Sequence, residues 1–178
     1  MTLKKCRKSL FFSIFTLAIA LGIGAYWAVP AMAAGTQAGA PPAVSAAAPD
    51  FELPDLNGSN VTLSQFKGKE PVLLYFWASW CPYCMAVRPN VINLRNQVPK
   101  GDLEILGINV GGGDSLARVK RFEEAHPAPY TVLYDGEGKA VRAYQVQGIP
   151  LFVLIDKNGN VKFRGNEFPA NAMELLKQ

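Results

Sequence analysis

The chain has 178 residues, 49% of them hydrophobic, and a formal net charge of +4. Lys4, Lys5, Arg7 and Lys8 are the only charged residues before Asp50, and the other 14 of the 18 basic residues balance the 14 acidic ones. The excess positive charge therefore belongs to the N-terminus. A nucleic-acid partner, which would need a basic patch on the folded domain, is not expected.

Residues 10–29 form an uncharged apolar segment directly after these four cations. Such a segment is typical of a secretory signal or of a single membrane-spanning helix. Tyr26 and Trp27 near its end favour a retained anchor, whereas Ala33 ends a small-x-small motif at which a signal peptidase could cleave. We expect residues 1–29 to be a membrane anchor or signal segment, with the anchor slightly favoured. The remainder would lie on the extracytoplasmic (periplasmic) side of the cell envelope.

Residues 30–49 consist almost wholly of small residues and proline, without charge or aromatic rings. This composition predicts a flexible tether. Residues 50–178 are enough for one domain with a hydrophobic core, and we expect that domain to be a monomer.

The first elements expected in residues 50–178 are two short strands, 51–53 and 61–63. They flank Asn57-Gly58, a dipeptide typical of hairpin turns. Apolar runs predict buried strands at 72–77 and 103–110. The remaining expected elements are helices at 82–97 and 115–125, a strand at 130–134, a short helix at 141–144, a hairpin of 151–155 with 161–164, and a helix at 169–177. Strands that alternate with helices predict a central mixed sheet with helices on both faces.

Cys81 and Cys84 are spaced one helical turn apart, directly after the strand at 72–77. If a helix begins at Cys81, free backbone N–H groups and the helix dipole stabilise its thiolate, which is the form that attacks disulfides. Pro82 suits the first helical turn. Half of a zinc site and an inert structural disulfide are the alternatives. Zinc needs about four ligands, and the chain offers only Cys6 and one histidine besides this pair.

Two further features have no predicted catalytic role. Gly111–Gly113 lack the lysine and the spacing of a phosphate-binding loop, and we expect them to form a flexible loop beside the active site. His126, the only histidine, is expected to be a solvated residue at a helix end.

Three motifs together resemble the thioredoxin superfamily. They are Trp80-Cys81-Pro82-Tyr83-Cys84, Pro89 five residues later, and the distant Gly148-Ile149-Pro150. Residues 48–68 add an entry segment similar to that of the membrane-anchored TlpA-, ResA- and CcmG-like thiol–disulfide oxidoreductases. The resemblance covers residues 48–178 and implies a thioredoxin-like α/β fold with an added N-terminal β-hairpin.

This resemblance implies that the Ile149–Pro150 bond is cis and packs against the disulfide. It also implies thiol–disulfide exchange, in which Cys81 attacks and Cys84 resolves the mixed disulfide. The expected substrate groove consists of Trp80, Pro82, Tyr83, Ile149 and Pro150. No metal or organic cofactor is expected. The implied partners are exported proteins that contain cysteine, among them apocytochrome c, and a membrane thiol electron donor.

The sequence departs from the resemblance at the acids that usually take the proton of the buried cysteine. Thioredoxins usually carry an acid at the position of Tyr75, and ResA-like proteins carry one at the position of Val87. No carboxylate occurs between Glu70 and Asp102. Water, or an acid from elsewhere in the fold, would have to serve instead.

Several functions remain open at this point. We favour a reductase of cell-envelope proteins in settings such as cytochrome c maturation, and a disulfide-forming oxidase is the nearest alternative. A peroxiredoxin-like peroxidase shares the entry motif but would have threonine in place of Cys81. A copper-binding chaperone would need a wider cysteine spacing and a ligating histidine.

Overall fold

The computed structural model describes residues 43–178. The expected anchor or signal segment at 1–29 and most of the expected tether lie outside the described residues. No helix within 43–178 has the length and apolar character needed to cross a membrane.

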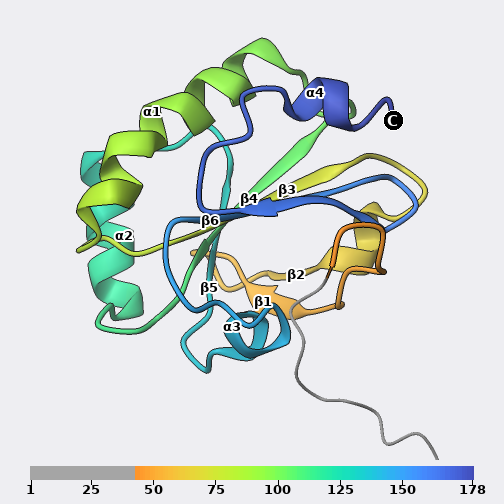
Figure 1. Ribbon diagram of the computed structural model, residues 1–178. Helices are drawn as coiled ribbons and strands as arrows, with labels where there is room; N and C mark the ends of the chain where they lie inside the picture. The colour runs from red at the N-terminus through yellow and green to blue at the C-terminus, as the bar shows by residue number, and fades with distance from the viewer. Residues whose placement is uncertain (1–42) are drawn as a thin grey trace, which may run out of the picture. The chain divides into compact units, whose positions relative to one another are not determined.

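The core of the fold is a five-stranded mixed sheet with the strand order β5-β4-β3-β6-β7 (Figure 1). Its strands are β3 (Val72–Trp77), β4 (Glu104–Asn109), β5 (Thr131–Tyr134), β6 (Leu151–Ile155) and β7 (Val161–Gly165). The first three run parallel to one another, whereas β6 pairs antiparallel with both β3 and β7. This is the mixed sheet of the thioredoxin-like fold that the sequence predicts.

The N-terminal hairpin consists of β1 (Glu52–Pro54) and β2 (Asn60–Thr62), followed by the 3-10 helix η1 (Leu63–Phe66). Both strands are antiparallel and begin within one residue of their predicted positions. A single bridge from Asp55 to Leu133 joins the hairpin to β5. The added hairpin is therefore confirmed.

The helices are α1 (Pro82–Gln97), α2 (Leu116–Ala125), α3 (Lys139–Ala143) and α4 (Ala172–Leu175). In Figure 1, α1 and α4 lie on one side of the sheet, and α3 lies with the β1–β2 hairpin on the other. The C-terminal helix is shorter than the 169–177 expected. Phe168 packs edge-on against Phe152, with ring centroids 5.7 Å apart, and fixes the chain before the helix begins.

The two faces of the sheet bury separate hydrophobic clusters. Leu74 and Phe76 of β3 point into the cluster under the hairpin and α3, while Tyr75 and Trp77 point into the cluster under α1, α2 and α4. Side chains alternate between the faces of a strand, and all six residues of β3 are buried. Because Cys81 and Cys84 belong to the second cluster, the dithiol is built on the α1 face.

The folded part begins before Asp50, where the sequence places the domain boundary. The backbone N–H of Ser45 donates to the Val161 carbonyl, and that of Ala48 donates to the Gly159 carbonyl. Ala47 forms a bridge with Asn160. These bonds join backbone groups only. The side chains of residues 43–49 therefore could not indicate that this segment pairs with the folded domain.

Candidate active site

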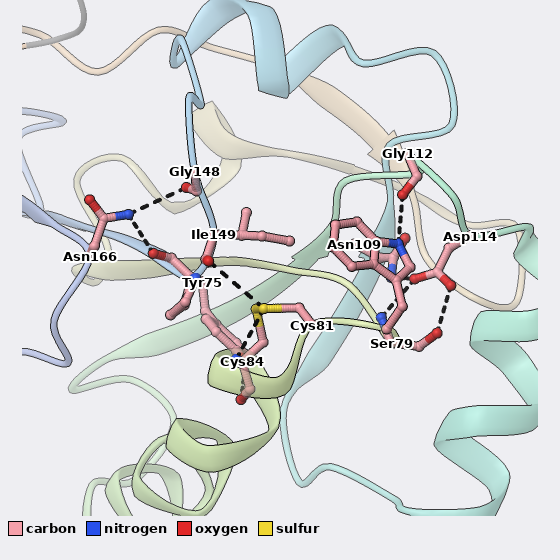
Figure 2. The surroundings of a disulfide bond; sticks show 12 residues. Tyr75, Ser79, Cys81, Cys84, Asn109, Gly112, Asp114, Gly148, Ile149 and Asn166 are labelled. Atoms are coloured by element: carbon pink, nitrogen blue, oxygen red, sulfur yellow. Dashed lines mark hydrogen bonds between the residues drawn. A yellow bond between two sulfur atoms is a disulfide. The ribbon is translucent and has the colours of Figure 1, made fainter.

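Cys81 and Cys84 are joined by a disulfide at the N-terminus of α1 (Figure 2). Cys81 is the N-cap residue and Pro82 is the first helical residue. The two Cα atoms lie 5.2 Å apart. Helix α1 therefore begins where the sequence predicts, and the pair is in its oxidised form.

The two sulfur atoms have different surroundings. Cys84 is fully buried, whereas Cys81 retains 4% of its surface exposed. The backbone N–H of Cys84 donates a hydrogen bond to the Cys81 Sγ at 3.1 Å. Together with the positive end of the α1 dipole, this bond stabilises negative charge on Cys81. Cys81 is the sulfur better placed to exist as a thiolate.

Tyr75 lies beneath the disulfide, at the position where thioredoxins carry an acid. Its hydroxyl donates to the Cys84 carbonyl oxygen at 2.8 Å, and its ring stacks on Phe152 with centroids 5.1 Å apart. Burial is the main cause that raises the pKa of Tyr75 far above its ordinary value. Tyr75 is thus neutral near pH 7 and donates to a backbone carbonyl, so it is no proton acceptor for Cys84.

The Ile149–Pro150 bond is cis, as the resemblance implies. The Ile149 carbonyl oxygen lies 3.8 Å from the Cys81 Sγ. The segment that precedes β6 therefore borders the Cys81 sulfur, 68 residues away in the sequence.

An open groove of about 690 Å³ runs beside this segment. Its lining comes from α1, from the loop before β6 and from the loop after β7: Tyr83, Ala86, Val87, Asn90, Gly148, Ile149, Pro150, Asn166, Glu167 and Phe168. Three of the five expected groove residues, Tyr83, Ile149 and Pro150, are brought together here. Val87 occupies the second acid position of the resemblance, and Glu167 is the one carboxylate among the lining residues.

Trp80 and Pro82 do not line this groove. The indole Nε1 of Trp80 donates to the Gly112 carbonyl oxygen at 2.7 Å, and half of the residue remains exposed. A Cβ added to Gly113 would lie 2.9 Å from that nitrogen. The Gly111–Gly113 loop therefore borders the active site, as expected, and supports Trp80.

Asp114 connects this loop to the residues before the dithiol. Its carboxylate accepts bonds from the Ser79 N–H at 2.7 Å, the Ser79 hydroxyl at 2.6 Å and the Asn109 amide at 2.8 Å (Figure 2). Burial raises the pKa of Asp114, but these hydrogen bonds and the charge of Arg118 outweigh burial and lower the pKa below its ordinary value. Asp114 is therefore a buried anion that fixes the turn between β3 and α1.

A largely buried ion pair joins α1 to α2. The Arg88 Nη2 lies 2.7 Å from a Glu123 carboxylate oxygen and also donates to the His126 carbonyl. The guanidinium lies 5.2 Å from the ring centroids of both Trp77 and Phe122. His126 is exposed at the end of α2, as expected.

Asn109, Asp114 and Asn166 belong to the site although no motif in the sequence indicates them. Ser115 caps α2 by accepting from the Arg118 N–H. Nothing in the sequence indicated that the neighbouring Asp114 carboxylate would reach Ser79 instead. Asn166 follows a strand without any local motif.

Known proteins are similar to this chain in sequence and in fold. The AhpC/TSA family profile matches residues 44–164. The chain belongs to the AhpC/TSA family. Among its relatives, the thiol-disulfide oxidoreductase ResA of Geobacillus kaustophilus is 38% identical over 120 residues, which are 67% of each chain. ResA of Bacillus subtilis is 34% identical over 114 residues, 64% of this chain and 62% of that one.

Solved structures agree with these relatives. A proposed thiol:disulfide interchange protein DsbE from Chlorobium tepidum has a TM-score of 0.66 and 32% identity, covering 76% of this chain and 94% of its own. The exposed lipoprotein thioredoxin Etrx1 of Streptococcus pneumoniae has a TM-score of 0.64 and 32% identity, covering 72% and 98%. With its paired cysteines on this thioredoxin-like fold, the family member described here is a thiol–disulfide oxidoreductase.

Proposed function

We propose that this family member is an exported reductase of disulfides in cell-envelope proteins, with Cys81 as nucleophile and Cys84 as resolving cysteine. The observation that carries the assignment of roles is the asymmetry of the two sulfurs. Cys81 caps α1, accepts the Cys84 N–H and borders Ile149, whereas Cys84 is fully buried.

The reaction starts from the dithiol form. The Cys81 thiolate attacks one sulfur of the substrate disulfide, the substrate S–S bond breaks, and its second sulfur leaves as a thiolate that takes a proton from water. Cys84 then loses its proton and attacks the Cys81 sulfur, which releases the first substrate sulfur as a second thiolate. Two electrons have passed to the substrate, and the Cys81–Cys84 disulfide has formed.

The substrate segment lies in the groove beside Tyr83, Ile149 and Pro150 in this proposal. The lining is mostly apolar, with Val87 and Phe168 on its walls. An extended segment can pair its backbone with Ile149, as in other strand-addition modes of peptide recognition. Trp80, which is half exposed and bonded to the Gly112 carbonyl, precedes Cys81 directly. Pro82 is exposed and begins the helix.

The Cys84 proton has one candidate acceptor on the groove wall, Glu167. Tyr75 is excluded by its raised pKa and its bond to a carbonyl. Water that reaches the groove is the other acceptor. In this proposal Glu167 or water accepts the proton that, in the resembling proteins, passes to an acid at the position of Tyr75 or Val87.

The proposed direction of electron flow rests on the proposed extracytoplasmic location, whereas a stabilised thiolate by itself makes the protein a better oxidant. In an oxidising compartment a dithiol has to be regenerated, and a membrane thiol donor would reset this one. Stabilisation of the Cys81 thiolate favours the reduced form. We therefore expect a reduction potential less negative than the value of about −270 mV for thioredoxin. Exported substrates would include apocytochrome c if the chain acts in cytochrome c maturation.

Trapping of mixed disulfides in cells tests the roles. A Cys84→Ser variant should accumulate mixed disulfides with envelope proteins through Cys81, and Cys81→Ser should not. Accumulation by Cys81→Ser alone would reverse the two roles.

The redox state of the pair in cells, measured by thiol trapping, tests the direction. A reductase should be found largely as the dithiol. A pair found oxidised, with a potential near the roughly −120 mV of DsbA in glutathione equilibration, would show an oxidase. Rapid peroxide consumption with a thiol donor would instead favour the peroxidase.

A further inference from the structure

We infer that Asn166 is a positioning residue for polypeptide substrates, because it holds the backbone on both sides of Ile149. The inference rests on the proposed function, since it concerns how a substrate segment docks beside Cys81. Asn166 lies in the loop after β7 and lines the same groove as Ile149 and Pro150.

A single amide nitrogen makes both contacts. The Asn166 Nδ2 donates to the Pro150 carbonyl oxygen at 2.7 Å and to the Gly148 carbonyl oxygen at 3.3 Å. A primary amide has two N–H groups on one nitrogen, so it can serve both acceptors at once. Asn166 thus connects the loop after β7 to residues 148 and 150 but not to the residue between them.

The Ile149 peptide group faces the other way. Figure 2 shows Asn166 on one side of this segment and Cys81 on the other, with the Ile149 carbonyl oxygen directed at the sulfur. Among the described residues, no backbone or side-chain group accepts a bond from the Ile149 N–H. The Ile149 N–H therefore stays available to an incoming chain, while the Ile149 carbonyl oxygen lies against the Cys81 sulfur.

These contacts restrict where a substrate can pair. The carbonyls of Gly148 and Pro150 are already used by Asn166, which leaves Ile149 as the pairing residue. Ile149 lies two residues before β6, and its carbonyl oxygen is 3.8 Å from the Cys81 Sγ. A segment paired there brings its own sulfur to Cys81 in a reproducible register.

The chemistry of the side chain decides whether the segment is held. Alanine at position 166 removes both donors and frees the 148–150 backbone to move. Aspartate at neutral pH has acceptors only, so it would direct negative oxygens at two carbonyl oxygens. The aspartate variant should therefore be worse than the alanine variant, although the two side chains of asparagine and aspartate have nearly the same shape.

A positioning role predicts selectivity for the type of substrate. A peptide that contains a disulfide needs its backbone aligned with Ile149. A small disulfide such as 2-hydroxyethyl disulfide has no amide groups to align and needs only access to Cys81. Loss of Asn166 should slow the first reaction and spare the second.

The test uses the full chain in its reduced form, mixed with an excess of either disulfide, with protein oxidation followed by thiol trapping. Asn166→Ala should lower the second-order rate constant with the peptide roughly tenfold, the loss expected for one or two hydrogen bonds. Its rate with 2-hydroxyethyl disulfide should stay within about twofold of wild type. Asn166→Asp should lower the rate constant with the peptide further than Asn166→Ala does, and it should also leave the rate with 2-hydroxyethyl disulfide nearly unchanged.

Asn96→Ala is the matched control, because Asn96 is exposed on α1, does not line the groove and makes no side-chain hydrogen bond among the described residues. It should react like wild type with both disulfides. Asn166→Ser keeps one donor, so its rate constant with the peptide should lie between those of wild type and Asn166→Ala. It also tests the proposal if the alanine variant folds poorly.

Equal losses with both disulfides, or no loss with the peptide, would overturn the positioning role. The proposed function would be unaffected by either result. It would fail separately if the reduced wild-type protein left both disulfides unreacted.

Discussion

The hydroxyl of Tyr75 donates a hydrogen bond to the carbonyl oxygen of Cys84, the buried cysteine, at 2.8 Å. Tyr75 thus stands where the resemblance places a buried acid, but its hydroxyl contacts the backbone of Cys84 and does not accept a proton from the Cys84 thiol. The ring is held between Phe152 and Trp77 in a stacked arrangement. Its role is to fix the first turn of α1 against the sheet.

A Tyr75→Phe variant should separate structure from proton transfer. The lost hydrogen bond should reduce the free energy of unfolding by about 1 kcal/mol, because the ring and its packing remain. The pH dependence of disulfide reduction should not shift, since a tyrosine whose pKa is raised by burial does not titrate near neutral pH. Urea denaturation and pH–rate profiles measure the two effects.

Tyr83→Phe is the control for that variant, because Tyr83 is 79% exposed and lies one residue before Cys84. It should leave stability unchanged. A pH–rate profile that moves in Tyr75→Phe but not in Tyr83→Phe would mean that Tyr75 takes part in proton transfer after all.

Gly113 and Gly112 form a second matched pair of positions. Gly113 has a φ of +78°, and a Cβ there would lie 2.9 Å from the Trp80 Nε1. Gly113→Ala should therefore cost roughly 1–2 kcal/mol of stability for the left-handed backbone and displace Trp80, which changes its fluorescence. Gly112→Ala meets no atom within 4 Å and should leave the fluorescence of Trp80 unchanged. Equal changes in both would indicate a general effect of loop rigidity.

Local signals explain why the dithiol and its helix could be predicted from the sequence. Cys81, Pro82 and Cys84 lie within four positions, and the apolar run before them has no competing interpretation as a helix. The helix expected at 115–125 likewise matches α2 (Leu116–Ala125), which Ser115 caps. Where several indicative residues lie close together in the sequence, the observed element begins and ends within a residue or two of its expected bounds.

The contacts around the dithiol could not be predicted, because they join residues far apart in the chain. Asp114 reaches Ser79 across 35 residues and Asn166 reaches Pro150 across 16. Their partners depend on how the ends of β3, β4 and β7 are placed by the sheet. The sequence showed that the usual acids were missing, but only the fold shows that Glu167 lines the groove.

The buried Asp114 carboxylate predicts a loss of stability in acid. Its folded-state pKa is lowered, so between the folded and unfolded pKa values the unfolded chain binds more protons. The stability that it contributes is fully present above the unfolded pKa and is lost as the pH falls through the folded pKa. Asp114→Asn should cost about 1–3 kcal/mol at neutral pH, measured by urea denaturation.

The difference between Asp114→Asn and wild type should shrink as the pH is lowered through that window, since the wild-type carboxylate is protonated there. Asp102→Asn provides a control at an exposed acid that makes no side-chain hydrogen bond among the described residues. It should follow the wild-type curve. A difference for Asp114→Asn that persists at every pH would show that the charge of Asp114 contributes nothing.

The ion pair between Arg88 and Glu123 predicts a large effect of removing one partner. Their side chains are only 6% and 11% exposed, and the nitrogen and oxygen lie 2.7 Å apart. Glu123→Gln leaves the Arg88 charge buried without its counter-charge, which should cost about 3–5 kcal/mol in the free energy of unfolding. The disulfide exchange rate per folded molecule should change little, because neither residue lines the groove.

The exposed pair of Glu137 and Lys139 supplies the comparison, with side chains 76% and 57% exposed. Glu137→Gln should change stability by less than about 1 kcal/mol, because solvent screens an exposed pair. Replacing both buried partners, Arg88→Met with Glu123→Leu, should recover part of the loss seen in Glu123→Gln, since no unpaired charge remains. If the double variant is instead less stable than Glu123→Gln, the guanidinium contributes mainly through its contacts with the faces of Trp77 and Phe122. The ion pair would then be secondary to those aromatic contacts in joining α1 to α2.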